Sequence, residues 1–154
     1  MKLLFSLLIL FVFSYAQDCQ SLTSRKATLE KEAIYEELLA EADRLIKEGC
    51  SSGSKKLLSS ADKVLSALEV LKYEEIELPS DKRLINIVVR QKMRNALLML
   101  NETGKYKNLN INLYSYQLLF YQVAKENNRV KDFNYALKYF QASYLLGRAI
   151  MELR

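Results

Sequence analysis

The sequence predicts an all-α domain of four to five antiparallel helices, and three observations lead to this fold class. The 154 residues include only four Gly and one Pro, whereas a β-sandwich of this size normally contains more turn-forming residues. Leu, Ala, Glu, Lys and Arg, which all favour helices, are abundant. Apolar residues also recur at steps of three and four along most of the chain, as they do on the buried face of a helix.

Residues 1–16 have the pattern of a secretory signal peptide. A basic residue, Lys2, precedes an apolar run over 3–13, and small residues follow it, so we expect cleavage between Ala16 and Gln17. As a helix, this run of 11 residues would cover about 16 Å of a hydrocarbon core about 30 Å thick. We therefore expect an exported protein, periplasmic or secreted, and retention of the segment as a membrane anchor is the alternative.

The mature chain, residues 17–154, is expected to form one domain, since its 138 residues match the usual size of a single core. Its first helix is predicted over about 22–48, where apolar residues fall on one stripe and charged residues on the other faces. Gly49 is the expected end of this helix. The second helix is predicted over about 54–72, with Ser54 as its N-cap.

Three further helices are predicted after a linker. The helix over about 81–102 begins just after Pro79 and Ser80, which are typical of a helix start. The last two helices are predicted over about 113–126 and 132–153, on either side of a short polar turn.

The predicted hairpin over 113–150 resembles one tetratricopeptide repeat. Small, aliphatic and aromatic residues occupy the positions at which the two helices of such a repeat pack; they are Phe120, Val123, Ala124, Phe133, Ala136, Leu137, Tyr139, Phe140 and Ser143. In the turn, Lys131-Asp132-Phe133 stands where the repeat usually has Gly-Asp-Tyr, and Asn127 stands where it has an aromatic residue. The resemblance implies a helical hairpin of this style, with a degenerate repeat array as the alternative to a plain helical bundle.

Charge is distributed unevenly along the chain. Residues 17–80 contain 9 Lys and Arg against 13 Asp and Glu, whereas residues 81–154 contain 13 against 5. Either the two halves attract each other within one fold, or the C-terminal half offers a basic surface to an acidic partner or an anionic membrane. Because exported proteins rarely meet nucleic acid, we expect no nucleic-acid partner.

The chain contains no His, which excludes Ser-His and Cys-His nucleophile pairs and histidine-ligated metals. Adjacent carboxylates such as Glu36 and Glu37 point about 100° apart on a helix, so they do not converge on one substrate atom. We therefore expect a protein that is not an enzyme and that has no catalytic, cofactor-binding or metal-binding residues.

The two cysteines, Cys19 and Cys50, are expected to be in an oxidising compartment. If 22–48 is one unbroken helix, its ends lie about 39 Å apart, whereas a disulfide needs Cα atoms within about 7 Å. We therefore expect the two thiols to be free or to pair between two chains. A bond within one chain would require a break in the helix.

Tyrosines and basic residues near the C-terminus indicate a partner surface on the last hairpin. Aromatic and Arg side chains are favoured at protein interfaces, and the candidate residues are Tyr121, Lys125, Arg129, Lys131, Tyr135, Lys138 and Tyr139. The alternative is that these rings pack inside the hairpin with their hydroxyl groups at the surface. The triplet Asn101-Glu102-Thr103 also matches the N-glycosylation pattern.

From these features we expect an exported, non-enzymatic interaction or scaffold module with a protein partner. The alternative is a structural protein of the cell envelope that associates with the membrane surface or forms homo-oligomers.

Overall fold

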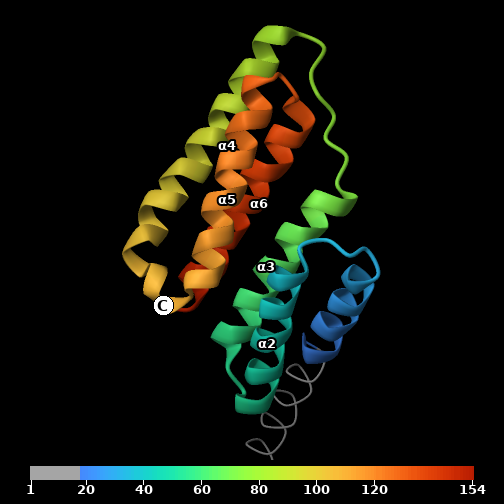
Figure 1. Cartoon of the computed structure of the whole chain (residues 1–154), viewed down its shortest axis with the longest axis vertical. Coiled ribbons are helices and arrows are strands. Elements are labelled where there is room, and N and C mark those ends of the chain that lie inside the picture. Colours follow the sequence, from blue (N-terminus) through green and yellow to red (C-terminus); the bar gives the residue numbers. More distant parts are fainter. Residues whose placement is uncertain (1–17) are drawn as a thin grey trace, which may run out of the picture.

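The structure, a computed structural model, describes residues 18–154, so the predicted signal peptide and its cleavage site lie outside the described residues. The described part is all-helical, which confirms the predicted fold class. In chain order it contains a helical segment over 18–30, α2 (Glu36–Ser52), α3 (Lys55–Tyr73), α4 (Lys82–Thr103), the 3₁₀ helix η1 (Gly104–Leu109), α5 (Ile111–Arg129) and α6 (Phe133–Glu152) (Figure 1).

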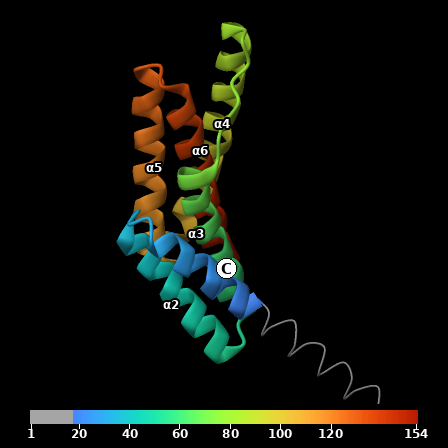
Figure 2. The same cartoon turned by 90° about the vertical axis from the view of Figure 1, so that its right-hand side faces the viewer.

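Helix α6 is the centre of the arrangement. It packs against α3, α4 and α5, while α2 packs against α3 and α5. Helices α4, α5 and α6 run along the long axis of the molecule, and the segment over 18–30 lies with α2 and α3 toward the other end (Figures 1 and 2). One apolar cluster joins α2 and α3 to the C-terminal half of α6, and a second joins α4 and α5 to its N-terminal half.

Small residues let the neighbouring helices approach α6 closely. Five small residues of α6 are buried, namely Ala136, Ala142, Ser143, Gly147 and Ala149. At Gly147, an added Cβ atom would lie 2.2 Å from Cγ of Met99 in α4 and 2.6 Å from Nε2 of Gln117 in α5. Since such distances are well inside van der Waals contact, α4, α5 and α6 approach so closely at Gly147 that a larger residue would have to displace the Met99 and Gln117 side chains.

Polar side chains fix where the helices begin. Ser54, Asp81, Asn110 and Asp132 each accept a hydrogen bond from a backbone N–H in the first turn of the helix that follows. Gly49, the predicted helix end, lies inside α2. That helix ends instead at Ser52, before Gly53 with a φ of 72°.

The predicted helix over 22–48 is wrong, because the chain forms two helices joined by a turn over 31–35. Ala33 and Tyr35 take left-handed conformations, with φ of 48° and 45°. The left-handed conformation costs a residue with a side chain roughly 1–2 kcal/mol. The sequence of the turn contains neither Gly nor Pro, so no local signal marks the break.

Aromatic packing holds this turn in place. The ring of Tyr35 packs edge-on against Tyr116 and Phe120, with centroids 6.2 Å and 4.9 Å apart. Its hydroxyl lies 2.6 Å from that of Tyr139 in α6. The two edge-to-face ring pairs contribute about 1–3 kcal/mol beyond the area they bury. With about 1 kcal/mol from the hydrogen bond, this is comparable to the backbone cost of the two left-handed residues.

The break also corrects the expectation for the thiols. With the chain reversed over 31–35, Cys19 and Cys50 form a disulfide within one chain, with Cα atoms 6.0 Å apart. The expected free or intermolecular thiols are therefore wrong, because the helix on which that expectation rested is not continuous. The disulfide joins the segment over 18–30 to α2 at the end opposite the turn.

We expect Gly147→Ala to lower the free energy of unfolding by about 1–3 kcal/mol, because the new methyl group must displace Met99 and Gln117. Chemical denaturation measures this change. The matched control is Gly104→Ala, whose added Cβ would meet only the Tyr114 hydroxyl at 3.7 Å. That control is expected to be neutral or slightly stabilising, and equal losses in both variants would contradict the close approach at Gly147.

Removing the disulfide with Cys19→Ser and Cys50→Ser together is expected to lower the free energy of unfolding by about 2–4 kcal/mol, since the bond closes a loop of 31 residues. The oxidised protein should run as a monomer on a non-reducing gel and should contain no reactive thiol. A disulfide-linked dimer would contradict the intramolecular bond.

Candidate interaction surface

Two of the residues predicted to form the partner surface lie in the interior. The side chain of Tyr121 is 8% exposed and packs edge-on against Phe140. Tyr139 is half-buried between Phe120 and the hydroxyl of Tyr35. Burial raises the pKa of both phenols, and in Tyr139 the hydrogen bond with Tyr35 raises it further. These two rings thus follow the alternative interpretation, in which they pack the hairpin.

The other five candidate residues lie at or near the surface. The ammonium group of Lys125 lies over the Tyr121 ring, 5.8 Å from its centroid, and Arg129 forms an ion pair with Glu126 of its own helix. Lys131 occupies the turn between α5 and α6 with a φ of 63°, while Tyr135 remains 55% exposed.

Lys138 and Tyr135 border an open hollow of about 360 Å³, completed by Asn134 and by Glu75 and Ile76 of the linker between α3 and α4. The structure therefore brings two of the predicted residues together with an acidic linker. It does not unite all seven into one surface.

A second surface was not predicted, and it lies on α4, η1 and α5. In the described residues eleven large apolar side chains are exposed, and eight of them belong to these three elements; they are Leu84, Ile87, Leu97, Leu98, Leu109, Ile111, Leu118 and Leu119. The other three are Tyr73, Val130 and Tyr135. Most of the large exposed apolar side chains of the described residues thus belong to three consecutive elements, and exposed apolar side chains are typical of binding sites.

The same stretch is strongly basic. Residues 82–125 contain eight Lys and Arg and a single acidic residue, Glu102. Arg83, Arg90 and Arg94 are exposed on α4 and have no ion-pair partner within residues 18–154. Their charge is therefore available to a partner.

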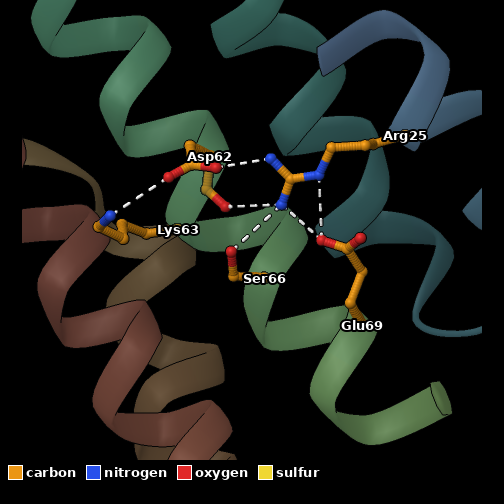
Figure 3. A network of polar contacts seen from close by, with 5 residues as sticks. All are labelled: Arg25, Asp62, Lys63, Ser66 and Glu69. Atoms are coloured by element: carbon orange, nitrogen blue, oxygen red, sulfur yellow. Dashed lines mark hydrogen bonds and ion pairs between the residues drawn. The ribbon is translucent and has the colours of Figure 1, made fainter. Parts of the chain in front are cut away.

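The N-terminal half differs, because nine ion pairs each join two residues of the stretch 25–72. Figure 3 shows the largest group, in which the guanidinium of Arg25 reaches from the first helical segment to Asp62, Ser66 and Glu69 of α3. Burial alone would raise the pKa of Asp62, but hydrogen bonds from Arg25 and Lys63 outweigh it and lower the pKa. These acidic groups serve the internal packing of the N-terminal half.

A buried carboxylate joins α2 to the start of α5. Glu41 is 9% exposed, and it accepts hydrogen bonds from Arg44 and, at 2.6 Å, from Nδ2 of Asn110. Asn110 in turn caps α5 by accepting from the N–H of Leu113. Burial alone would raise the pKa of Glu41, but the hydrogen bonds from Arg44 and Asn110 reverse the shift and lower it. This cluster has a structural role, because both carboxylate oxygens of Glu41 and the side-chain amide of Asn110 form hydrogen bonds within the fold.

Between residues 18 and 154, no group of three or more Cys, Asp and Glu side chains is placed to hold a metal ion. None of the helices in this range combines the length and the hydropathy that a transmembrane span needs.

Comparison of the chain with protein-family models, with curated proteins and with solved structures gave no match. The surface on α4, η1 and α5 therefore has to be interpreted from its own chemistry.

A signal for this surface was present in the sequence, since residues 82–125 carry almost no acidic residue. Apolar residues at steps of three and four predict one buried face for the helix over 81–102. Burial shows that α4 instead exposes Leu84, Ile87, Leu97 and Leu98. Periodicity alone does not distinguish a helix with one apolar face from one with two.

We expect Glu41→Gln to lower the free energy of unfolding by about 1–3 kcal/mol at neutral pH, because the charged hydrogen bonds to Arg44 and Asn110 are weakened. A carboxyl whose pKa is lowered by folding stabilises the folded state above its ordinary pKa, here 4.5, and loses that contribution as the pH falls below it. The difference between the two proteins should therefore shrink below about pH 4.5, measured by denaturation at several pH values. A difference that stays constant down to pH 2.5 would show that the charge of Glu41 contributes nothing.

Proposed function

We propose that the protein is an exported, non-enzymatic interaction module that binds a protein partner. The observation that carries the proposal is the combination, on α4, η1 and α5, of eight exposed large apolar residues with unpaired Arg side chains. Exposed apolar patches mark interaction sites, and Arg is among the residues that contribute most of the binding energy at protein interfaces. The excess of basic over acidic residues in 82–125 favours a partner of acidic character.

The hairpin of α5 and α6 supports the same proposal. Its inner positions are filled by small and aromatic residues, including Phe120, Ala124, Ala136 and Phe140, which are all buried. A tetratricopeptide-like hairpin of this kind is a rigid support for side chains on its outer faces. In such a scaffold, Lys131, Tyr135 and Lys138 at its turn end would form a second point of contact.

Association with an anionic membrane surface is the second candidate function. It is favoured by one observation, the mixture of exposed Leu and Ile with Arg and Lys on the same helix α4, since side chains of both kinds attach helices to anionic lipid. Each basic residue near such a surface contributes about 1 kcal/mol.

Site-specific photo-crosslinking in the native envelope tests the first proposal. A photoreactive residue at Ile87, on α4, is expected to give discrete protein adducts, and one at Tyr135 tests the turn end of the hairpin. The control position is Ala40, which is exposed on α2 and far from the basic stretch in sequence. Equal labelling at Ile87, Tyr135 and Ala40 would mean that no specific protein contact exists.

Charge reversal at Lys131 and Lys138 then separates the two contact points. If α4 carries the binding, this double variant should keep the adducts formed at Ile87. Loss of those adducts would transfer the main contact to the hairpin end.

Co-sedimentation with vesicles containing anionic lipid, at low and at high salt, tests the second candidate. Binding that is strong at low salt and lost at high salt would favour the membrane function. Absence of binding at low salt would remove it.

A further inference from the structure

The outward face of α4 has the spacing of a coiled-coil seam. Starting at Leu84, the steps to Ile87, Gln91, Arg94 and Leu98 are three, four, three and four residues, and Asn101 follows after three more. All of these side chains are exposed, with Leu84, Ile87 and Leu98 at 50%, 60% and 56%. This alternation keeps side chains on one stripe of a helix that faces a partner helix.

The opposite face of α4 is already used. Val89 and Ala96 are buried in the cluster that α4 shares with α5 and α6, and Lys92 donates a hydrogen bond to Gln141 of α6. Helix α4 therefore has one stripe that packs inside the fold and a second that has no partner within the described residues. This second stripe has the residue spacing of a coiled-coil seam, so a helix of a partner could pack along it.

The charges beside the seam define the partner. In a heptad that begins at Leu84, Arg83 and Arg90 fall on the flanking position that forms ion pairs across a coiled coil, and Arg94 falls in the seam itself. No carboxylate of residues 18–154 pairs with any of the three. A partner helix must therefore bring Asp or Glu to its own flanking positions and opposite Arg94.

The α4 helix of a second copy of the chain does not meet this requirement. In a parallel pair of α4 helices, Arg83 and Arg90 would face Val88 and Asn95, and in an antiparallel pair they would face each other or Leu97. Neither arrangement supplies a carboxylate, and like charges that face each other weaken the contact. The flanking charges thus act against self-association through this face.

We propose that the outer stripe of α4 docks an acidic amphipathic helix of another protein, along Leu84, Ile87, Arg94 and Leu98, with Arg83 and Arg90 pairing to its carboxylates. This inference deepens the proposed function and rests on it. The polar Gln91 and Arg94 in the middle of the seam would set the register of the docked helix, as polar seam residues do in coiled coils.

A synthetic peptide tests the proposal against the purified full chain. The probe is a helix of about three heptads, matched to the 22 residues of α4, with Leu and Ile at the seam and Glu at the flanking positions. The comparison peptide carries Lys in place of Glu. Fluorescence anisotropy should show binding of the acidic peptide and at least roughly tenfold weaker binding of the basic one.

Matched variants assign the binding to α4. The triple variant Arg83→Gln, Arg90→Gln and Arg94→Gln should weaken binding of the acidic peptide roughly tenfold, since each exposed ion pair contributes a factor of about two to three. The control triple variant changes the net charge equally at the exposed Lys31, Lys47 and Lys56, which lie outside the basic stretch 82–125, and should leave binding within about twofold. Far-UV circular dichroism verifies that all variants remain helical.

Four results would overturn the docked helix. They are equal binding of the two peptides, equal effects of the two triple variants, binding to anionic vesicles without binding to the acidic peptide, and a concentration-dependent dimer in light scattering. The last two would assign the face to lipid or to a second copy. Protein adducts at Tyr135 but not at Ile87 would leave the interaction module standing and remove α4 from it.

Discussion

The close approach of three helices at Gly147 is the constraint on which the fold depends. A side chain at this position would overlap both Met99 and Gln117, so the distances of α4 and α5 from α6 are set at one point. The hydroxyl of Ser143, one turn earlier, donates to the backbone carbonyl of Gln117 and fixes the register of α5 on α6. Because α4 packs against α5 and α6 along one stripe only, its other stripe stays at the surface.

Helices α2 and α3 share an apolar cluster with α6, and aromatic and polar contacts add to this attachment. The turn at Tyr35 enters an aromatic cluster with Phe120 and Tyr139, and Tyr116 of α5 donates to Glu37. The hydrogen bond between Glu41 and Asn110 adds a further polar contact between α2 and the start of α5. Most charged side chains of residues 25–72 form ion pairs inside the fold, whereas in the described part of the chain the exposed Arg side chains of α4 do not.

The helical class and the approximate ranges of the last four helices follow from residues that act locally. Ser54 caps α3 as expected, and the helix predicted over 81–102 lies at Lys82–Thr103. The turn at 31–35 could not be predicted, because it depends on the contact of Tyr35 with residues about one hundred positions away. The expectation of free or intermolecular thiols is wrong for the same reason, since the geometry of the disulfide depends on that turn.

The candidate surface shows a related limit of local reasoning. Tyr121 and Tyr139 are of a residue type typical of interfaces, yet Tyr121 packs against Phe140 and Tyr139 packs against Phe120. Leu84, Ile87 and Leu98 have the composition of a core, yet nothing within the described residues covers them. Which of two apolar stripes is buried depends on how many neighbours a helix has, and α4 lies at the edge of the layer (Figure 2).

The buried Thr103 determines when the glycosylation triplet can be used. Its hydroxyl donates to the carbonyl of Met99 and lies 2.8 Å from Oε1 of Gln117, and its side chain is inaccessible in the folded protein. An enzyme that must contact both Asn101 and this hydroxyl can therefore do so only before α4 has formed. Attachment of a sugar would have to occur during synthesis or translocation, because the hydroxyl is inaccessible once the protein has folded.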